Sequence, residues 1–463
     1  MCGIIENYQE LRDELAADGH DFESETDTEV VPHLVEAELR SGTEPEEAVR
    51  RALGRLDGSY AVAVVVAGID AIFASRNDSP LVLGVGDGET YLASDVPAFR
   101  EYTDRVDWDP EETGKSGYDH YMLKEIHEQP RALRQCLQGR VDELGASVTL
   151  DLDVDPERVQ FVAAGTSYHA ALYGASLVQA AGVPANAYYG HEYASGPPPL
   201  DDALVVGVSQ SGETADTLSA LREARRHGAK TLAVTNVVGS TMARECDETM
   251  YIRSGPEIGV AATKTFAAQQ AALNLFALDV AGADDRRAVI RALRDLPGGV
   301  QHVLDDTIAK EVAEEYVDAS GYFFIGRGLN YPVALEGALK LKEISYEHAE
   351  GFAAGELKHG TLALVTEETP VFAVVTGDGE RARKTVGNVK EVEARDAPVV
   401  AVTDGRSDVE RYADQTLEIP ETHPRTAAVL ANVQLQLVAY HVADLLGRPI
   451  DKPRNLAKSV TVE

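Results

Sequence analysis

A polar turn near the middle of the chain follows a run of apolar, mostly β-branched residues at 205–208 and precedes a helical pattern at 215–228. Its polar side chains are Ser209, Gln210, Ser211 and Thr214. Hydroxyls and an amide at the carboxyl end of a strand, beside the free N–H groups of a helix N-terminus, form an anion site that suits phosphate. An N-capping serine on an ordinary crossover helix needs only one such side chain. The turn therefore predicts a phosphate site.

A second group of reactive side chains lies on the helix predicted over 332–350. At roughly 100° per residue, one narrow stripe of this helix carries Glu336, Lys340, Glu343 and Glu347. The remaining surface is mostly apolar, so the helix should be largely buried, and its charges must pair internally or face a cavity. The alternative is an i,i+4 salt bridge on a solvated face. That arrangement fits helices that are apolar on only half of their surface, and it fits this mostly apolar helix poorly. A Glu and a Lys together in a cavity can move a proton between neighbouring carbons.

His359 lies in a loop bracketed by Gly355 and Gly360, between the acidic helix and a strand pattern at 371–375. A lone loop histidine is usually only solvated, so its position is what brings it into consideration.

The C-terminal segment 451–463 carries three basic residues against two acidic ones, although the chain as a whole is acidic. We expect this segment to bury Leu456, Val460 and Val462 while presenting Lys458 to an anionic pocket, instead of fraying. A desolvated lysine in such a pocket can form a Schiff base with a ketone.

The elements that position these residues alternate between strand and helix from about residue 155. Strands are predicted at 159–163, 204–208, 231–235 and 248–251, and again at 322–325, 371–375 and 399–403. This alternation predicts an α/β fold with parallel, doubly wound sheets covered on both faces. The two sets look like copies of one unit. The second copy has Asp378 opposite Ser211 and Arg381 opposite Thr214, so we expect only the first copy to hold phosphate.

Residues 1–105 form a mixed α/β pattern. Helices are expected at 4–18, 29–41 and 45–56, strands at 59–66, 71–75, 80–84 and 90–94, an acidic linker at 106–117, and a helix at 120–137 broken at Pro130.

Composition limits the partners that this protein can have. The 463 residues allow two or three domains, and the net charge of −35 argues against nucleic acid or an anionic membrane surface. Such acidity is typical of proteins adapted to high salt, where the Debye length shrinks to roughly 3 Å at 1 M. Three scattered cysteines, no membrane-spanning run and no signal-peptide pattern indicate a reducing cytoplasm. We expect no cofactor and no metal.

Several of these motifs together resemble one family, glutamine–fructose-6-phosphate aminotransferase (isomerising), or glucosamine-6-phosphate synthase. They are Ser209–Thr217, Glu257–Lys264, Ala334–Glu343, Gly355–Gly360 and Pro453–Glu463. The resemblance runs from about Ile4 to the last residue. It implies two sugar-isomerase (SIS) domains, assembled as a homodimer, that convert fructose 6-phosphate and ammonia to glucosamine 6-phosphate.

The resemblance also implies a role for each matching residue. The phosphate would be held by Ser167, Ser209, Gln210, Ser211 and Thr214, and the sugar lined by Thr166, Val260 and Ala457. Lys458 would form the Schiff base at C2, and His359 of the neighbouring subunit would open the ring. Glu343 would move the proton between C1 and C2, assisted by Lys340 and Glu336.

The N-terminal part departs from the family. The family's glutaminase domain begins with Cys-Gly-Ile, followed by a long segment that contains an oxyanion hole. Here Met1-Cys2-Gly3 continues directly into Ile4, as if that segment were excised, although Ser24–Asp27 resembles the family's glutamine-binding aspartate motif. Each missing oxyanion donor costs on the order of 10²–10³ in rate. We therefore expect Cys2 and Asp27 to support little or no glutamine hydrolysis, and the N-terminal third to be poorly stable.

The resemblance divides the chain into five parts: a truncated glutaminase-type domain at 1–117, linker helices at 118–150, SIS domains at 151–290 and 310–447, and an active-site tail at 448–463. Two other functions stay open at this point. One is a non-catalytic sugar-phosphate sensor, which needs neither Glu343 nor Lys458. The other is a deaminase that runs the reaction toward fructose 6-phosphate.

Overall fold

The computed structural model describes residues 2–77, 81–85, 89–93 and 114–458. The chain divides into two compact units. The first contains Met1–Trp108 together with Glu213–Asp216 and Ser459–Glu463, and the second contains Asp109–Gly212 and Thr217–Lys458. The segments 94–113 and 459–463, which include most of the expected linker as well as Val460 and Val462, lie outside the described residues.

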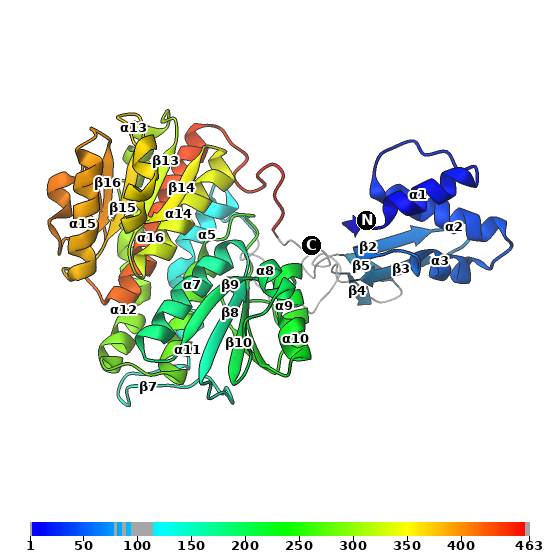
Figure 1. The fold of residues 1–463 in the computed structure, drawn as a ribbon, viewed down its shortest axis with the longest axis horizontal. Helices are drawn as coiled ribbons and strands as arrows, with labels where there is room; N and C mark the ends of the chain where they lie inside the picture. Colours follow the sequence, from blue (N-terminus) through cyan, green and yellow to red (C-terminus); the bar gives the residue numbers. More distant parts are fainter. Residues whose placement is uncertain (1, 78–80, 86–88, 94–113, 459–463) are drawn as a thin grey trace. The chain divides into compact units, whose positions relative to one another are not determined.

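The first unit is built on an antiparallel sheet in the order β1-β2-β3, drawn in blue in Figure 1. Its strands are β1 (Cys2–Ile5), β2 (Gly58–Val65) and β3 (Ile72–Asn77), its helices are α1 (Tyr8–Ala17), η1 (Asp27–Glu29), α2 (Val30–Arg40) and α3 (Pro45–Leu53), and β4 (Val82–Val85) pairs with β5 (Thr90–Ala93). Leucines and valines of the helices, such as Leu11 and Leu34, pack with Ile5 and Tyr60 of the sheet into a small core.

One prediction for this unit is wrong. The helix expected over 4–18 is a strand at its start, because Ile4 and Ile5 pair with Ser59 and Gly58 of β2, and α1 begins only at Tyr8. Apolar, β-branched residues favour a strand where a partner strand is available. The other helices and strands expected here lie within a few residues of their predicted positions.

The second unit contains two five-stranded sheets, ordered β12-β11-β10-β8-β9 and β14-β13-β15-β16-β17. The first is formed by β8 (Arg158–Ala163), β9 (Ala185–Tyr189), β10 (Ala203–Ser209), β11 (Lys230–Thr235) and β12 (Glu248–Tyr251), and the second by β13 (Tyr322–Gly326), β14 (Ala349–Ala353), β15 (Val371–Val375), β16 (Val399–Thr403) and β17 (Gln415–Glu418). All pairings in both are parallel, which confirms the predicted fold class.

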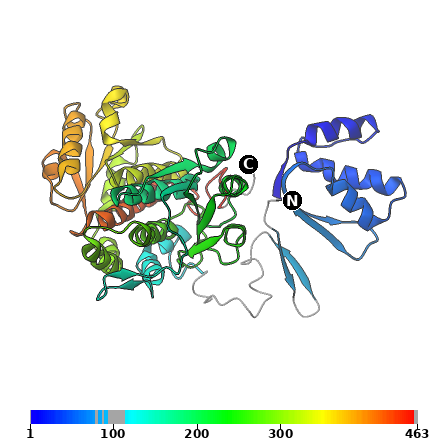
Figure 2. The same cartoon turned by 60° about the horizontal axis from the view of Figure 1, so that its bottom comes forward.

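Helices lie on both faces of each sheet (Figure 1), and Figure 2 gives the same fold turned by 60°. They are α5 (Tyr121–His127), α6 (Gln129–Leu137), α7 (Gly165–Ala180), α8 (Gly190–Ser195), α9 (Ala215–Arg226), α10 (Thr241–Glu245), α11 (Lys264–Val280), α12 (Arg286–Asp305), α13 (Ala309–Tyr316), α14 (Asn330–Ser345), α15 (Glu380–Glu393) and α16 (Pro424–Leu445). Short elements complete the unit: β6 (Val141–Asp142), β7 (Ser147–Val148), η3 (Ala354–His359), η4 (Thr361–Leu364) and η5 (Asp408–Tyr412). None of the described helices is long and apolar enough to cross a membrane.

The two sheets share one large hydrophobic core. It contains Phe161 and Phe276 on the side of the first sheet and Phe324, Leu341 and Tyr440 on the side of the second. Within it, α14 packs against α16 and also contacts α7 of the first half. Because α14 belongs to the second half, this contact brings residues of both halves to one place.

Each sheet has a topological switch point at its first strand. The chain leaves β8 to form β9 on one side and β10 on the other, and it leaves β13 to form β14 and β15 in the same way. In open parallel sheets, ligands bind outside the carboxyl ends of the strands at such a point. The fold therefore offers two equivalent ligand positions, one in each half.

The long helix predicted over 332–350 is shorter than expected. α14 ends at Ser345, because Tyr346 adopts a left-handed conformation with φ of 68°. Ala349–Ala353 then form β14 instead of continuing the helix. Glu347 consequently leaves the predicted charged stripe and accepts a hydrogen bond from Arg448 Nη2 at 3.1 Å.

Candidate functional site

The predicted phosphate turn follows β10 and is held by backbone hydrogen bonds. Gly212 donates its N–H to Ser209 Oγ at 3.1 Å, and the backbone carbonyl of Gln210 accepts from Asn236 N at 3.1 Å. Gly212 has φ of +66°, and a Cβ there would overlap the Ser240 side chain, so the turn requires glycine. Ser209 is buried, whereas Gln210 and Ser211 are partly exposed.

The turn lies beside the loop that follows β8. Val208 and Ala163 are partners in the parallel pairing of β10 and β8, so the residues after them leave adjacent strands, which lie about 4.8 Å apart. Thr166 and Ser167 lie just after that loop, in the first turn of α7. Ser167 Oγ accepts from Gln269 Nε2 at 2.9 Å. The predicted phosphate ligands Ser167, Ser209, Gln210 and Ser211 thus lie at one switch point, while Thr214 is grouped with the first unit.

A buried charged cluster on α14 reaches this loop. The Lys340 ammonium lies 2.5 Å from Glu343 Oε2 and 3.4 Å from Glu336 Oε1, and it donates to Thr166 Oγ1 at 3.1 Å. The side chains of Lys340 and Glu336 are essentially inaccessible, and that of Glu343 is about one-fifth exposed. The predicted stripe is therefore internal, and it contacts the first half of the fold through Thr166.

The pKa of Lys340 follows from these neighbours. Burial alone lowers the pKa of this ammonium, but the carboxylates of Glu343 and Glu336 outweigh burial and raise it overall. Glu336 is also within 2.7 Å of His169 Nδ1 and accepts from Thr166 Oγ1 at 3.0 Å. The cluster therefore carries a lysine that stays charged, next to one partly accessible carboxylate that can accept a proton.

Lys458 lies in a second charged group, with Glu257. Its ammonium pairs with Glu257 Oε2 and donates to the carbonyl of Gly259 at 2.8 Å. Glu257 Oε1 also accepts from the backbone of Thr263 at 2.9 Å. Burial works to raise the pKa of Glu257, but Lys458 and the donated hydrogen bonds lower it overall. Lys340 lies within electrostatic range of Glu257, so the two groups belong to one charged region.

A fourth carboxylate, Glu125 of α5, borders this region. Its Oε1 accepts from the backbone N–H groups of Ile258 at 2.5 Å and Gly259 at 3.2 Å. Burial, followed by the charge of Glu257, raises the pKa of Glu125 to about 7. A carboxyl with this pKa can exchange a proton near neutral pH.

Sequence reasoning assigned no role to Glu125, Glu257 or His169. Glu257 lay inside a recognised motif, which was the only available signal. Nothing local marks Glu125, because its partners lie about 133 residues away in the sequence.

The tail reaches the site by a different anchor from the one predicted. Leu456 is 46% exposed, so its expected burial is wrong, and Ala457 is exposed too. The anchors are Ile450, which is fully buried, and Asp451. The carbonyl of Asp451 accepts from Val260 N at 3.1 Å, and its carboxylate accepts from Met122 N at 3.0 Å. Ile450 and the hydrogen bonds of Asp451 fix the tail here, and the side chain of Leu456 stays exposed.

His359 is not joined to these groups. It ends η3, is exposed, and forms no hydrogen bond or ion pair with Lys340, Glu343 or Lys458 among the described residues. Its proposed action from a neighbouring subunit stays a prediction.

In the first unit, Cys2 begins β1 opposite Ala61. The carboxylate of Asp27, the expected glutamine ligand, accepts from the backbone N–H of Ile5 at 2.8 Å. Elsewhere in this unit, His20, His33 and Glu36 place three possible metal-ligand atoms within 4.8 Å of one another. The Nδ1 atoms of the two histidines are 3.1 Å apart, which a hydrogen bond between two imidazoles explains without an ion.

Taken together, the second half of the chain combines a polar turn predicted to bind an anion, a buried lysine–carboxylate cluster, and a tail lysine paired with Glu257. A turn of this kind can fix the phosphate end of a substrate, and lysines and carboxylates of this kind can act on its carbons.

Family models match two parts of the chain: a glutamine amidotransferase domain at residues 1–101 and a SIS domain at residues 154–279 and 315–445. Three similar curated proteins are described as glutamine–fructose-6-phosphate aminotransferase (isomerizing). They come from Halobacterium salinarum (51% identical), Methanosarcina acetivorans (44%) and Thermus thermophilus (44%), and the matches cover all of this chain and 84%, 84% and 83% of those proteins. The region aligned with the first spans 510 residues, so that relative has residues inside it that this chain of 463 lacks.

Two solved structures resemble the second unit. The C-terminal domain of glucosamine-fructose-6-phosphate aminotransferase from Francisella tularensis is 36% identical with a TM-score of 0.69, over 74% of this chain and all of that one. A glucosamine-6-phosphate deaminase from Thermotoga maritima is 26% identical with a TM-score of 0.61, over 73% of this chain and 99% of that one.

Proposed function

Since the chain belongs to the family of isomerising glutamine–fructose-6-phosphate aminotransferases, we propose that it forms glucosamine 6-phosphate from fructose 6-phosphate, with glutamine or free ammonia as nitrogen donor. The observation that carries this proposal is the contact of Lys340 with Thr166, Glu336 and Glu343. It joins the acid–base helix of one half to the loop beside the phosphate turn of the other.

In this mechanism the phosphate of fructose 6-phosphate binds at Ser167, Ser209, Gln210, Ser211 and Thr214, while Thr166, Val260 and Ala457 line the sugar. The Lys458 amine attacks the C2 carbonyl, and water leaves as the imine forms. Glu257, which pairs with Lys458, orients the ammonium before it loses its proton.

Ammonia then replaces the lysine amine at C2. Glu343 removes a proton from C1 and returns it to C2, while the proton of the C1 hydroxyl passes to the C2 nitrogen, which converts the ketose imine to the amino aldose. Lys340 and Glu336 support this step, because the Lys340 ammonium donates to Glu343 and holds its carboxylate in place. His359 of a partner subunit opens the sugar ring before these steps, so the proposal includes a homodimer.

The glutaminase half is proposed to be impaired. Two features support this. The Halobacterium relative has internal residues that this chain lacks. The carboxylate of Asp27 already accepts a hydrogen bond from the backbone N–H of Ile5. With Cys2 as its only nucleophile and no oxyanion donors from the missing segment, hydrolysis of glutamine should be slow. We also propose the five-part domain division at 1–117, 118–150, 151–290, 310–447 and 448–463.

The acidic composition supports the further proposals of adaptation to high salt and of no nucleic-acid or membrane partner. The three scattered cysteines support the proposal of a cytoplasmic location. The salt proposal predicts that fold and activity weaken together on dilution of potassium chloride, since repulsion among carboxylates then rises.

One experiment separates the functions. The protein is incubated with fructose 6-phosphate and either glutamine or ammonium, and glucosamine 6-phosphate is measured. Product with ammonium alone supports the proposal with an impaired glutaminase, and product at equal rates with both donors refutes the impairment. No product with either donor indicates a sugar-phosphate sensor. Turnover that proceeds only from glucosamine 6-phosphate indicates a deaminase, for which the Thermotoga structure provides the resemblance.

A further inference from the structure

The switch point of the second half is the structural counterpart of the phosphate turn. In the first half, the loops after β8 and β10 flank the switch point and carry the proposed phosphate ligands. Their counterparts are the segments 327–330 and 376–381, which follow β13 and β15 and run into the first residues of α14 and α15. The proposed function assigns no ligand to this position.

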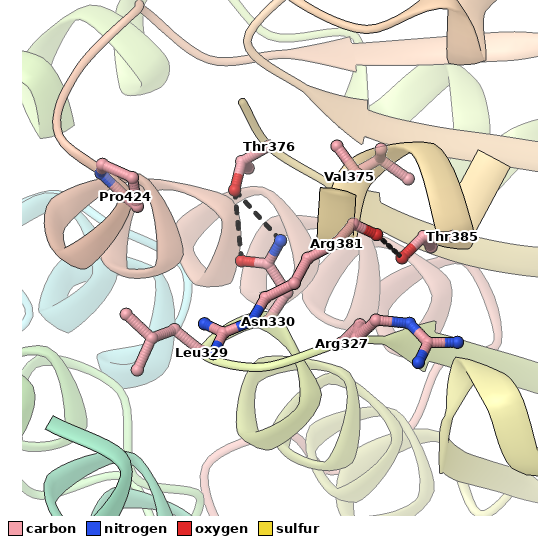
Figure 3. Close-up of a pocket in the computed structure, with 9 residues that line it drawn as sticks. Arg327, Leu329, Asn330, Val375, Thr376, Arg381, Thr385 and Pro424 are labelled. Atoms are coloured by element: carbon pink, nitrogen blue, oxygen red, sulfur yellow. Dashed lines mark hydrogen bonds between the residues drawn. The ribbon is translucent and has the colours of Figure 1, made fainter. Parts of the chain in front are cut away.

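Two neighbouring cavities open at this second switch point. One has a volume of about 60 Å³ and is lined by Arg327, Leu329, Asn330, Val375, Thr376, Arg381, Ala382, Thr385 and Pro424 (Figure 3). The other, of about 330 Å³, is lined by Ser176, Leu177, Gln179, Ala180, Gly328, Leu329, Arg381 and Arg425. Leu329 and Arg381 line both cavities, and Figure 3 shows their side chains at the smaller one.

The walls of both cavities are positively charged. They contain Arg327, Arg381 and Arg425, and no acidic side chain. Among the described residues, none of these three guanidinium groups forms an ion pair with a carboxylate; Arg327 donates to the amide oxygen of Asn388 at 3.2 Å. Asp285, which pairs with His423, is within electrostatic range of Arg425. In a chain with a net charge of −35, three neighbouring arginines without an ion-paired carboxylate among the described residues indicate that an anion belongs there.

Arg425 gives the most direct indication. The residue is only 8% exposed, it lines the larger cavity, and its Nη1 has no hydrogen-bond partner among the described residues. Nε of Arg327 is likewise buried and without a partner. Buried charged donors are nearly always satisfied, because an unsatisfied one costs several times a typical hydrogen bond.

We propose that these cavities form a second anion site, which binds a tetrahedral phosphate dianion, either inorganic phosphate or the phosphate group of a sugar ester. Arg381 and Arg425 neutralise its charge, and Thr376 and Asn330 supply neutral polar contacts from the smaller cavity. The first half binds phosphate through hydroxyls and helix N–H groups, whereas the second half uses guanidinium groups at the equivalent place.

Asp378 does not oppose this site. Sequence comparison of the two halves suggested that an aspartate in this loop would repel phosphate, yet Asp378 is exposed and lines neither cavity. The counterpart of Thr214, Arg381, is the residue that reaches the cavities. The replacement therefore changes the kind of phosphate ligand and does not abolish the site.

The cavity also adjoins the helix that carries the charged cluster. Asn330, the first residue of α14, lines the smaller cavity, and Glu336 follows six residues later, about 9 Å along the helix. The two ligand positions are thus joined by one buried helix.

Equilibrium dialysis with radiolabelled inorganic phosphate, at a fixed high concentration of potassium chloride, tests the proposal on the full chain. We expect two phosphates per chain for the wild type. Arg381→Leu should weaken one site by about tenfold or more, as expected for loss of a charge-assisted contact. Since Arg381 is exposed, this substitution should leave the fold intact. A Ser209→Ala, Ser211→Ala double variant should instead lose the other site.

Lys384→Gln is the matched control. It removes one positive charge from the same helix, α15, but Lys384 pairs with Glu380 and lines neither cavity. Arg425→Gln provides a second variant that keeps hydrogen-bonding capacity while removing the charge. In the Ser209→Ala, Ser211→Ala background, displacement by glucose 6-phosphate identifies a sugar-ester site, and binding of inorganic phosphate alone identifies a site for the free ion. A single phosphate per wild-type chain, unaffected by Arg381→Leu and Arg425→Gln, overturns the proposal.

Discussion

Replacing Lys340 with methionine tests whether the charged cluster on α14 is internal and coupled. Lys340 and Glu336 have almost no accessible surface, and the ammonium also pairs with Glu343 at 2.5 Å. Lys340→Met keeps the length of the side chain but leaves Glu336 as a buried charge without its cation. Breaking a buried pair in this way costs about 3–5 kcal/mol in unfolding free energy.

The double variant Lys340→Met, Glu336→Gln separates stability from chemistry. With both charges removed, most of the lost stability should return, because the isolated buried charge is gone. Formation of glucosamine 6-phosphate should remain about 10²–10⁴-fold below wild type, the usual contribution of a positioned acid–base group.

The assays are urea unfolding at a fixed potassium chloride concentration and product formation with ammonium as donor. Lys384→Met serves as control, because Lys384 pairs with Glu380 on the surface, where both side chains are more than half exposed. A surface pair contributes at most about 1 kcal/mol. A Lys340→Met variant as stable as this control would contradict the burial of the charged pair. A double variant that turns over at the wild-type rate would contradict its role in the chemistry.

Three further predictions follow from the same region. The fold raises the pKa of Glu125 from 4.5 to about 7, so the folded protein binds this proton more tightly than the unfolded chain does. The free energy of unfolding should therefore fall by up to about 3 kcal/mol as pH rises from about 4.5 to about 7. Glu125→Gln should lack this decline when unfolding is measured against pH, and a curve parallel to that of the wild type would contradict the shift. Glu257→Gln should slow borohydride trapping of fructose 6-phosphate by about tenfold with phosphate affinity unchanged, whereas an unchanged trapping rate would mean that Glu257 does not orient Lys458. Gly212→Ala should raise the KM for fructose 6-phosphate through displacement of the turn by Ser240, and an unchanged KM would show that this turn does not hold the phosphate.

The central strands could be predicted from sequence because they are buried on both faces. β10, β13, β15 and β16 are continuous apolar runs, fully buried along their length, so each stands out from its surroundings. The edge strands β9 and β17 are short and only partly buried, and no apolar run marks them. Sequence reasoning missed both.

The end of α14 was not predictable for a different reason. The chain stops the helix at Tyr346 with a left-handed conformation, although no glycine, asparagine or proline marks the position. Pairing of Ala349–Ala353 with β13 and the contact of Arg448 with Glu347 then stabilise the new direction. These partners come from distant parts of the sequence, so local propensity could not reveal them.

The candidate site was only partly visible for the same reason. Residue type and spacing pointed to Ser209, Lys340 and Lys458, because each stood out in its local context. Glu257 acquires its role only through Lys458, which lies 201 residues away. The tail shows the opposite error, because a residue that sequence reasoning singled out, Leu456, was expected to be buried and is 46% exposed. Backbone hydrogen bonds at Asp451, which have no sequence pattern, position the tail instead.

The central claim is that the first half of the fold holds the phosphate while α14 and the tail act on the carbons, with Lys458 forming the imine. Borohydride reduction of the protein with fructose 6-phosphate, followed by mass-spectrometric mapping of the modified peptide, tests it most directly. We predict a single hexose phosphate adduct on Lys458, absent from Lys458→Ala, which should still bind phosphate. An adduct on Lys340, or trapping that survives in Lys458→Ala, would contradict the assignment.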